Sequence, residues 1–241
     1  MQTAIEQVPK HIAIILDGNG RWAARHRLPR HRGHLEGVRR VEDIVKMAIR
    51  HDIQILTLYA FSTENWRRPR QEINALMRLL CSMLEKKKQM FARHNIRLNF
   101  IGERNGIGSD ILKTIDRAIS ATRSNTGLML NIAFNYGSRQ EIVQAIKAMI
   151  RDKEAGRLAL DRIKEETVND YLYTHGLPDP DLLIRTSGEL RISNFLLWQL
   201  SYSELYFTDT CWPDFNQDEF MQALLEYQRR ERRYGKVSSS A

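Results

Sequence analysis

The chain has 241 residues, 42% of them hydrophobic, so it can bury a sizeable core without disulfides or a structural metal. Cys81 and Cys211 have no metal-ligand spacing around them, which makes redox and zinc chemistry improbable. The net charge of +8 favours acidic partners: nucleic acid, an anionic membrane surface or phosphorylated small molecules. No apolar run is long enough to cross a bilayer, so we expect a soluble, cytoplasmic protein.

Apolar strand-like segments alternate with amphipathic helical segments, which is typical of a parallel sheet covered by helices on both faces. The predicted strands are Ile12–Leu16, Ile53–Phe61, Ile96–Ile101, Leu128–Phe134, Leu182–Arg185 and Glu204–Phe207. The predicted helices are Leu35–His51, Glu72–His94, Ser109–Arg123, Ser138–Ala155, Thr167–Thr174 and Asp218–Arg233. We therefore predict an α/β fold: a single domain over residues 1–241 with a central, mostly parallel six-stranded sheet, and flexible tails at 1–10 and 236–241.

The first predicted strand runs straight into a turn suited to a phosphate. Asp17 falls where such a strand delivers side chains to a crevice. Gly18 and Gly20 allow backbone N–H groups to approach an anion, and a helix beginning near Arg21 would point its positive end at the same place. The spacing also fits an ordinary tight turn, and it is neither a Walker loop nor a dinucleotide fingerprint.

Three further polar clusters attract attention. Two lie at or just after strand ends, where ligands bind in open parallel sheets: Ser62-Thr-Glu-Asn-Trp-Arg-Arg-Pro69 and Ile184-Arg-Thr-Ser-Gly-Glu-Leu-Arg-Ile-Ser-Asn194. The third is the basic segment 25–34, in which Arg30 and His34 stand out. For the first cluster the alternative is a helix-capping loop, and for the other two it is solvated surface charge. Arg185, Arg191 and Ser193 nevertheless offer donors suited to diphosphate oxygens.

Carboxylates are sparse, and no aspartate-rich motif for several metal ions is present. Asp17 and Glu204 remain as carboxylates near strand ends, which predicts one Mg²⁺ held by them and by diphosphate oxygens. The helix from Glu72 carries a long apolar stripe that either packs in the core or lines an elongated apolar tunnel for a hydrocarbon chain.

These motifs, in this order, resemble the cis-prenyltransferases (Z-isoprenyl diphosphate synthases), and among them the bacterial undecaprenyl diphosphate synthases. The segments that carry the resemblance are His11-Ile-Ala-Ile-Ile-Leu-Asp-Gly-Asn-Gly-Arg-Trp-Ala23, Arg32-Gly-His34, Thr57-Leu-Tyr-Ala-Phe-Ser-Thr-Glu-Asn-Trp66, Leu130-Asn-Ile-Ala-Phe-Asn-Tyr-Gly137, Leu183-Ile-Arg-Thr-Ser-Gly-Glu189, Arg191-Ile-Ser-Asn-Phe-Leu-Leu-Trp-Gln199 and Glu204-Leu-Tyr-Phe207. The resemblance covers nearly the whole chain.

The resemblance implies a Mg²⁺-dependent homodimer that condenses isopentenyl diphosphate repeatedly onto an allylic diphosphate, usually farnesyl diphosphate, with each addition creating a cis double bond. The expected product is a long polyprenyl diphosphate, above all undecaprenyl diphosphate for the cell-wall lipid carrier. A lipid product also implies peripheral membrane contact for its release. The alternatives are a synthase of shorter or longer chains and a non-catalytic activating subunit. A nucleic-acid binder is disfavoured because no basic stripe is interleaved with stacking aromatics.

The resemblance also implies roles for individual residues. Asp17 would be catalytic through metal binding and leaving-group departure, and Asn65 through orientation or proton relay. The metal would be reached by Asp17 and Glu204. Substrates would be bound by Gly18, Asn19, Gly20, Arg21, Trp22, Arg30, His34, Ser62, Thr63, Glu64, Trp66, Arg68, Arg185, Arg191, Ile192 and Ser193. Leu190 stands where some relatives carry a histidine, so no ligand is expected there, and Arg233-Tyr-Gly235 resembles a tail motif that joins the diphosphate site across a dimer.

Overall fold

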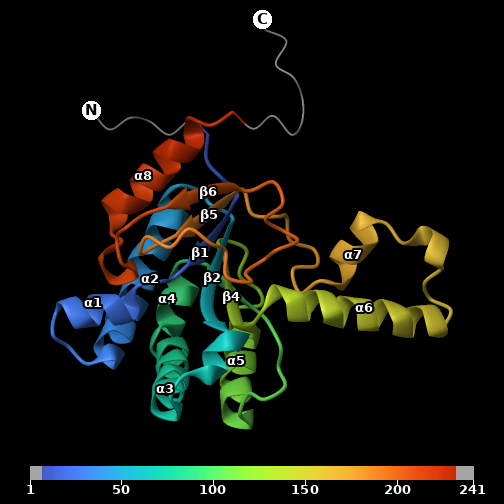
Figure 1. Ribbon diagram of the computed structural model, residues 1–241, viewed down its shortest axis with the longest axis horizontal. Helices are drawn as coiled ribbons and strands as arrows, with labels where there is room; N and C mark the ends of the chain where they lie inside the picture. The colour runs from blue at the N-terminus through green and yellow to red at the C-terminus, as the bar shows by residue number, and fades with distance from the viewer. Residues whose placement is uncertain (1–6, 232–241) are drawn as a thin grey trace, which may run out of the picture.

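Every strand of the central sheet runs parallel to its neighbours, in the order β3-β4-β2-β1-β5-β6 (Figure 1). The computed structural model describes residues 7–231. The strands are β1 (His11–Ile15), β2 (Ile55–Ser62), β3 (Arg97–Ile101), β4 (Met129–Tyr136), β5 (Leu182–Arg185) and β6 (Glu204–Phe207). The predicted six-stranded parallel sheet is confirmed. The apolar and β-branched runs form the largely buried central strands β1, β2, β4 and β5, while β3 and β6 lie at the edges and are more exposed.

The helices largely follow the sequence pattern. They are α1 (Asn19–Arg25), α2 (Arg30–Arg50), α3 (Arg70–Lys86), α4 (Lys88–Arg93), α5 (Ser109–Ala121), α6 (Ser138–Glu154), α7 (Glu165–Tyr171) and α8 (Gln217–Gln228), with short 3₁₀ turns η1 (Thr63–Arg67), η2 (Leu160–Arg162) and η3 (Trp212–Asp214). Helix α2 begins at Arg30, directly after Pro29 as its N-cap, and thus earlier than predicted. The basic residues of its first turn hide the apolar period. The predicted helix 72–94 breaks at Lys87, inside a run of three lysines. Of the described residues, none belongs to a helix long and apolar enough to span a bilayer.

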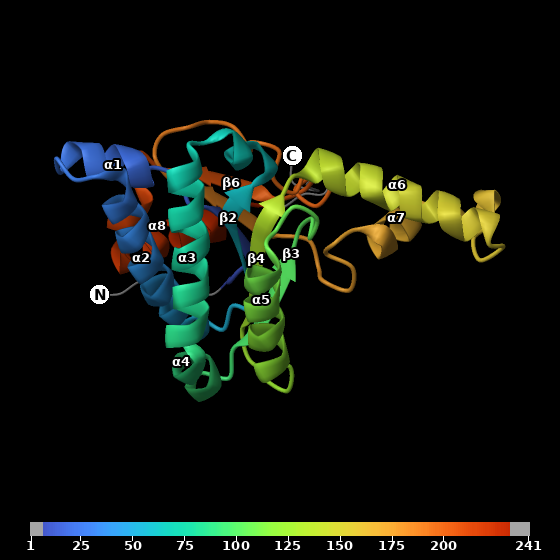
Figure 2. The ribbon, with the colours of Figure 1, turned by 90° about the horizontal axis from the view of Figure 1, so that it is seen from below.

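The two faces of the sheet are covered differently. Helices α2, α3, α5 and α8 pack on one face, over strand residues such as Ile14, Leu58 and Ile132. On the other face, where a second helical layer was expected, Phe195 and Leu196 from the segment between β5 and β6 cover the sheet. Helices α6 and α7 project from the body as an arm (Figure 2).

Helices α1 and α2 approach each other unusually closely. A Cβ on Gly33 of α2 would lie 2.0 Å from the carbonyl oxygen of Asn19, so only glycine fits there. The turn that enters α1 is equally constrained, because Gly18 adopts φ +98° and a Cβ there would meet the Ser187 side chain. This packing fixes the loop after β1 over the carboxyl end of the sheet.

Candidate functional site

A cavity of about 600 Å³ lies between the carboxyl ends of the strands and helices α2 and α3. Its polar lining comes from the loops after β1, β2 and β5 and from the facing helix ends, and consists of Asp17, Gly18, Asn19, Gly20, Arg30, His34, Ser62, Glu64, Asn65, Arg68, Arg185, Ser193 and Asn194. Its apolar lining includes Val38, Val41, Leu58, Phe61, Leu76, Leu79, Leu80, Met83, Ile132 and Phe134. One cavity therefore joins a polar mouth to an apolar interior.

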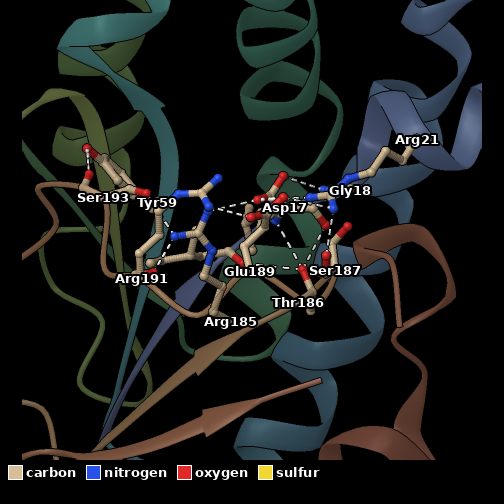
Figure 3. Close-up of polar contacts among 12 residues, drawn as sticks. Asp17, Gly18, Arg21, Tyr59, Arg185, Thr186, Ser187, Glu189, Arg191 and Ser193 are labelled. Atoms are coloured by element: carbon tan, nitrogen blue, oxygen red, sulfur yellow. Dashed lines mark hydrogen bonds and ion pairs between the residues drawn. The ribbon is translucent and has the colours of Figure 1, made fainter. Parts of the chain in front are cut away.

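The side chains of Asp17 and Arg185 form the centre of the polar mouth (Figure 3). In the sheet, Arg185 pairs with Ile15, so the end of β5 lies beside the loop that carries Asp17. Arg185 is almost fully buried, and its Nη2 donates to Asp17 Oδ2 at 2.9 Å. Its Nη1 donates to Ser193 Oγ at 2.8 Å and to the Arg191 carbonyl, while its Nε is buried without a partner. Arg185 thus ties the loop after β5 to the loop after β1.

Asp17 is held as a carboxylate. Burial alone would raise its pKa, but the hydrogen bonds from Arg185 and the Gly18 N–H and the charges of Arg185 and Arg21 outweigh burial and lower the pKa below its ordinary value. The Gly18 N–H donates to Oδ1 at 2.7 Å, and Arg21 Nη2 lies 3.3 Å from Oδ2. Asp17 is therefore a charged carboxylate that faces the cavity with cations around it.

A second polar group gathers on Glu72 of α3, a residue that the sequence did not single out. Its Oε1 lies 3.1 Å from Arg68 Nη1, 3.3 Å from Arg30 Nε and 3.4 Å from His34 Nε2. Burial and the Arg68 charge lower the pKa of His34 below its ordinary value, against the opposing effect of Glu72. Through Glu72, the structure brings together three predicted diphosphate-binding residues, two from helix α2 and one from the loop after β2.

Asn65 and Trp66 are positioned by the 3₁₀ turn η1. Asn65 Oδ1 accepts the Ser62 N–H at 3.1 Å, within a capping box. Because an N–H can meet only the amide oxygen, this bond fixes the side chain and leaves the Asn65 NH₂ as a donor at the cavity wall. Trp66 Nε1 donates to Asn135 Oδ1 at 2.6 Å, and its ring packs edge-on against Phe61.

Several predicted substrate-binding residues do not line the cavity. Trp22, a residue of α1, donates to Asp214 of η3 at 2.7 Å and stacks on His26, so it ties α1 to η3 outside the cavity. Thr63 Oγ1 is buried without a hydrogen bond, and Ile192 packs in the cluster on the second sheet face. Arg21 and Arg191 both pair with Glu189 at the rim of the mouth. Their contact with substrate stays a prediction.

Within one chain, Glu204 does not lie beside Asp17, and its contact with the metal stays a prediction. Glu204 is the first residue of β6 and pairs with Leu182, which starts β5, so it lies at the amino end of a sheet whose carboxyl end carries Asp17. Its Oε2 accepts from Arg230 Nη1 at 2.9 Å. In residues 7–231 no group of three or more His, Cys, Asp or Glu side chains is placed to hold a metal. The related tail motif at 233–235 lies outside the described residues.

Sequence reasoning also missed polar supports of the mouth. Glu189 links Arg21 to Arg191, and Tyr59 donates weakly to the carbonyls of Tyr136 and Ser193. Glu189 lies inside a quoted motif, so its charge between arginines was an available signal. Tyr59 reads as one more apolar strand residue, and nothing in its local sequence distinguishes it.

Residues 15–235 match the family described as "Putative undecaprenyl diphosphate synthase". The isoprenyl transferase of Geobacillus kaustophilus is 50% identical over 232 residues, which are 96% of this chain and 90% of the relative. Lavandulyl diphosphate synthase from Lavandula x intermedia, solved in complex with dimethylallyl diphosphate, is similar with a TM-score of 0.93 and 35% identity, over 95% of this chain and 99% of that chain. A probable undecaprenyl diphosphate synthase from Campylobacter jejuni is similar with a TM-score of 0.79 and 34% identity, over 96% and 100% of the two chains.

Proposed function

Because the chain belongs to the undecaprenyl diphosphate synthase family, it is a prenyl transferase, and we propose that it elongates farnesyl diphosphate with isopentenyl diphosphate in successive cis additions to a long polyprenyl diphosphate. We assign undecaprenyl diphosphate, the precursor of the cell-wall lipid carrier, as the product. The single observation that carries the proposal is the joined cavity: a cationic mouth for two diphosphates opens on an apolar interior that suits a prenyl chain.

The allylic diphosphate lies against the Gly18–Arg21 segment, with Arg30 and His34 on its other side. The first N–H groups of α1 have no partner within the helix and are available to its oxygens. As the allylic C1–O bond breaks, negative charge grows on the departing diphosphate. Donors that are already in place stabilise that charge without reorganising during the reaction.

Isopentenyl diphosphate lies against Arg68, Arg185, Arg191 and Ser193. Its C4 attacks the allylic C1, a C2 proton leaves, and the pair of electrons from that C–H bond forms the new double bond. Since Asn65 presents an NH₂ and its oxygen is engaged by Ser62, it orients a diphosphate oxygen rather than accepting the proton. We assign the proton to a diphosphate oxygen.

Mg²⁺ fits this mouth through one carboxylate. Asp17 is charged and faces the cavity, which suits an ion that takes one or two protein carboxylates and most of its other ligands from diphosphate and water. Bound there, the ion would neutralise diphosphate charge and assist leaving-group departure. Glu204 of the same chain does not reach that position, so we keep Asp17 alone as the ligand from this chain.

Trp66 and its loop close the mouth over the prenyl group. Trp66 is 39% exposed, its ring packs against Phe61 and its Nε1 donates to Asn135, so part of the side chain stays available to a prenyl group at the mouth. Closure would exclude water from a centre with cationic character.

The arm formed by α6 supports a homodimer. Val143, Ile146 and Ile150 lie on one helical face and are each about half exposed, at 47%, 46% and 51%. An apolar stripe of this kind is typical of a protein interface. Light scattering should give a dimer for the wild type and a monomer for Ile146→Glu, and a monomeric wild type would contradict the assignment.

The proposal is tested by incubating the purified chain with labelled isopentenyl diphosphate, farnesyl diphosphate and Mg²⁺, followed by mass analysis of the dephosphorylated product. We expect a long polyprenol and loss of incorporation with EDTA. A shorter or longer product would support the alternative chain lengths. No incorporation by the chain alone would instead support the non-catalytic subunit.

A further inference from the structure

We propose that the turn between α1 and α2 docks this protein on an anionic lipid surface. The turn, residues 24–32 (the basic turn), consists of nine consecutive exposed residues. Its basic side chains are Arg25, His26, Arg27, Arg30, His31 and Arg32. No Asp or Glu occurs anywhere between Asp17 and Glu36, so the local charge is of one sign.

Most of this charge is not neutralised by the rest of the protein. Arg30 lies 3.3 Å from Glu72 at the cavity mouth. Among the described residues, Arg25, Arg27 and Arg32 have no carboxylate within 4.0 Å. Three cations are therefore available to anionic headgroups at the outer side of the turn.

The basic turn is held rigidly. The Leu28 N–H donates to the Ala23 carbonyl at 2.8 Å, closing the end of α1. Trp22 donates to Asp214 at 2.7 Å and stacks on His26 at 4.1 Å between ring centroids. Because the arginines are displayed on a fixed frame, docking costs less ordering entropy than a disordered basic tail would pay.

Two features favour a lipid surface over nucleic acid. Leu28, 38% exposed, is the large apolar side chain at the middle of the turn and can enter the headgroup region. Residues 24–32 contain no Phe, Trp or Tyr on which bases could stack. A basic surface with an apolar tip matches the chemistry of an anionic bilayer.

The basic turn also borders an opening of the prenyl cavity. A groove of about 740 Å³ runs between α2 and α3, with Arg30, His31 and His34 at one end and Leu35, Leu76 and Leu79 along it. Arg30, His34, Leu76 and Leu79 line both this groove and the catalytic cavity. Resting on the proposed function, we assign the groove as the lateral path by which a long prenyl chain passes into the bilayer without crossing water.

The test measures binding of the full-length protein to sedimented vesicles of phosphatidylcholine alone and of phosphatidylcholine with phosphatidylglycerol at 7:3. The variant combines Arg25→Gln, Arg27→Gln and Arg32→Gln. The control combines Lys86→Gln, Lys113→Gln and Arg123→Gln, which removes the same charge from exposed positions elsewhere. Each basic residue near an anionic surface is worth about fivefold in binding, so we expect roughly 100-fold weaker binding for the variant and little change for the control.

Equal binding of the wild type to both vesicles, or equal losses in variant and control, would overturn the proposal. The proposal would also be overturned if the wild type bound a single-stranded RNA more tightly than the vesicles at the same salt concentration, and if the same three changes abolished that RNA binding. Prenyl transfer without vesicles is measured in parallel and should be unchanged in both variants. If the wild type prefers the vesicles with phosphatidylglycerol but shows no prenyl transfer, only the proposed function is refuted. If it shows normal prenyl transfer but no preference between the vesicles, only the docking surface is refuted.

Discussion

Arg185 and Asp17 share a hydrogen bond of 2.9 Å that joins the ends of two neighbouring parallel strands, β5 and β1. The strand order turns back at this point, since β1 leads to β2 on one side and β5 lies on the other. Ligands bind at such switch points in open α/β sheets. The pair therefore places a guanidinium and a charged carboxylate side by side where diphosphates are expected. The hydrogen bond fixes the carboxylate before any substrate arrives.

Asp17→Asn should keep the fold but lower kcat by about 10²–10³, because the side chain keeps its shape and loses the charge that supports leaving-group departure. Steady-state kinetics with farnesyl and isopentenyl diphosphates measure the change. Asp209→Asn, an exposed aspartate after β6, is the control. Near-normal kcat in Asp17→Asn would remove Asp17 from the catalytic machinery.

Arg68→Lys should raise KM for isopentenyl diphosphate about tenfold and change kcat less. Arg68 donates to Glu72 at 3.1 Å and keeps further N–H groups of its fork for a diphosphate, whereas a lysine has one point charge for both. A loss of binding common to ground and transition states appears in KM. The neighbouring Arg67→Lys is the matched control, since Arg67 does not line the cavity. Unchanged KM in Arg68→Lys would contradict this role.

The sheet and the three strand-end loops were predictable because they depend on local signals. Buried strands require apolar runs, and polar clusters after them mark the carboxyl edge once the sheet is parallel. The position of Glu204 could also have been inferred, because a residue that starts a parallel strand must lie at the opposite edge from residues that follow one. The predicted strand Glu204–Phe207 already contained that geometry.

Other parts of the site depend on contacts between distant segments. Glu72 reads as an acidic residue in the first turn of a helix, which is ordinary for helix N-termini. Its role as the common partner of Arg30, His34 and Arg68 arises only when α2 packs beside α3. Trp22 is the opposite case, because it was predicted to bind substrate, yet it does not line the cavity and has a structural role. That role also depends on a distant contact, since its bond to Asp214 joins residues 192 positions apart.

His11 should make the folded state sensitive to acid. Burial lowers its pKa from 6.5 to about 4, and its ring nitrogens are engaged by the Pro178 carbonyl and the Thr57 hydroxyl, both at 2.7 Å. At pH values between about 4 and 6.5, His11 is protonated in the unfolded chain and neutral in the folded chain. The free energy of unfolding therefore falls as the pH falls from 6.5 towards 4. This residue contributes a loss of about 2 kcal/mol between pH 7 and pH 5.

Urea unfolding of His11→Gln at both pH values checks this expectation. The variant should start less stable, yet its free energy of unfolding should fall by about 2 kcal/mol less than that of the wild type between pH 7 and pH 5. His94→Gln, at an exposed position, should keep the wild-type dependence. The same pH dependence in wild type and His11→Gln would show that other groups account for it.

Met83→Trp should shorten the polyprenyl product. Met83 lines the apolar part of the cavity and lies eleven residues beyond Glu72 on α3, about 16 Å along the helix from the cationic mouth. A bulky ring there blocks late additions and leaves the first ones room, so early turnover should persist while the product distribution shifts to fewer isoprene units. Mass analysis of the dephosphorylated products measures the shift. Met221→Trp is the control, because Met221 also packs half-buried against the core without lining the cavity. Wild-type chain length in Met83→Trp, or equal shortening in the control, would show that this cavity does not hold the growing chain.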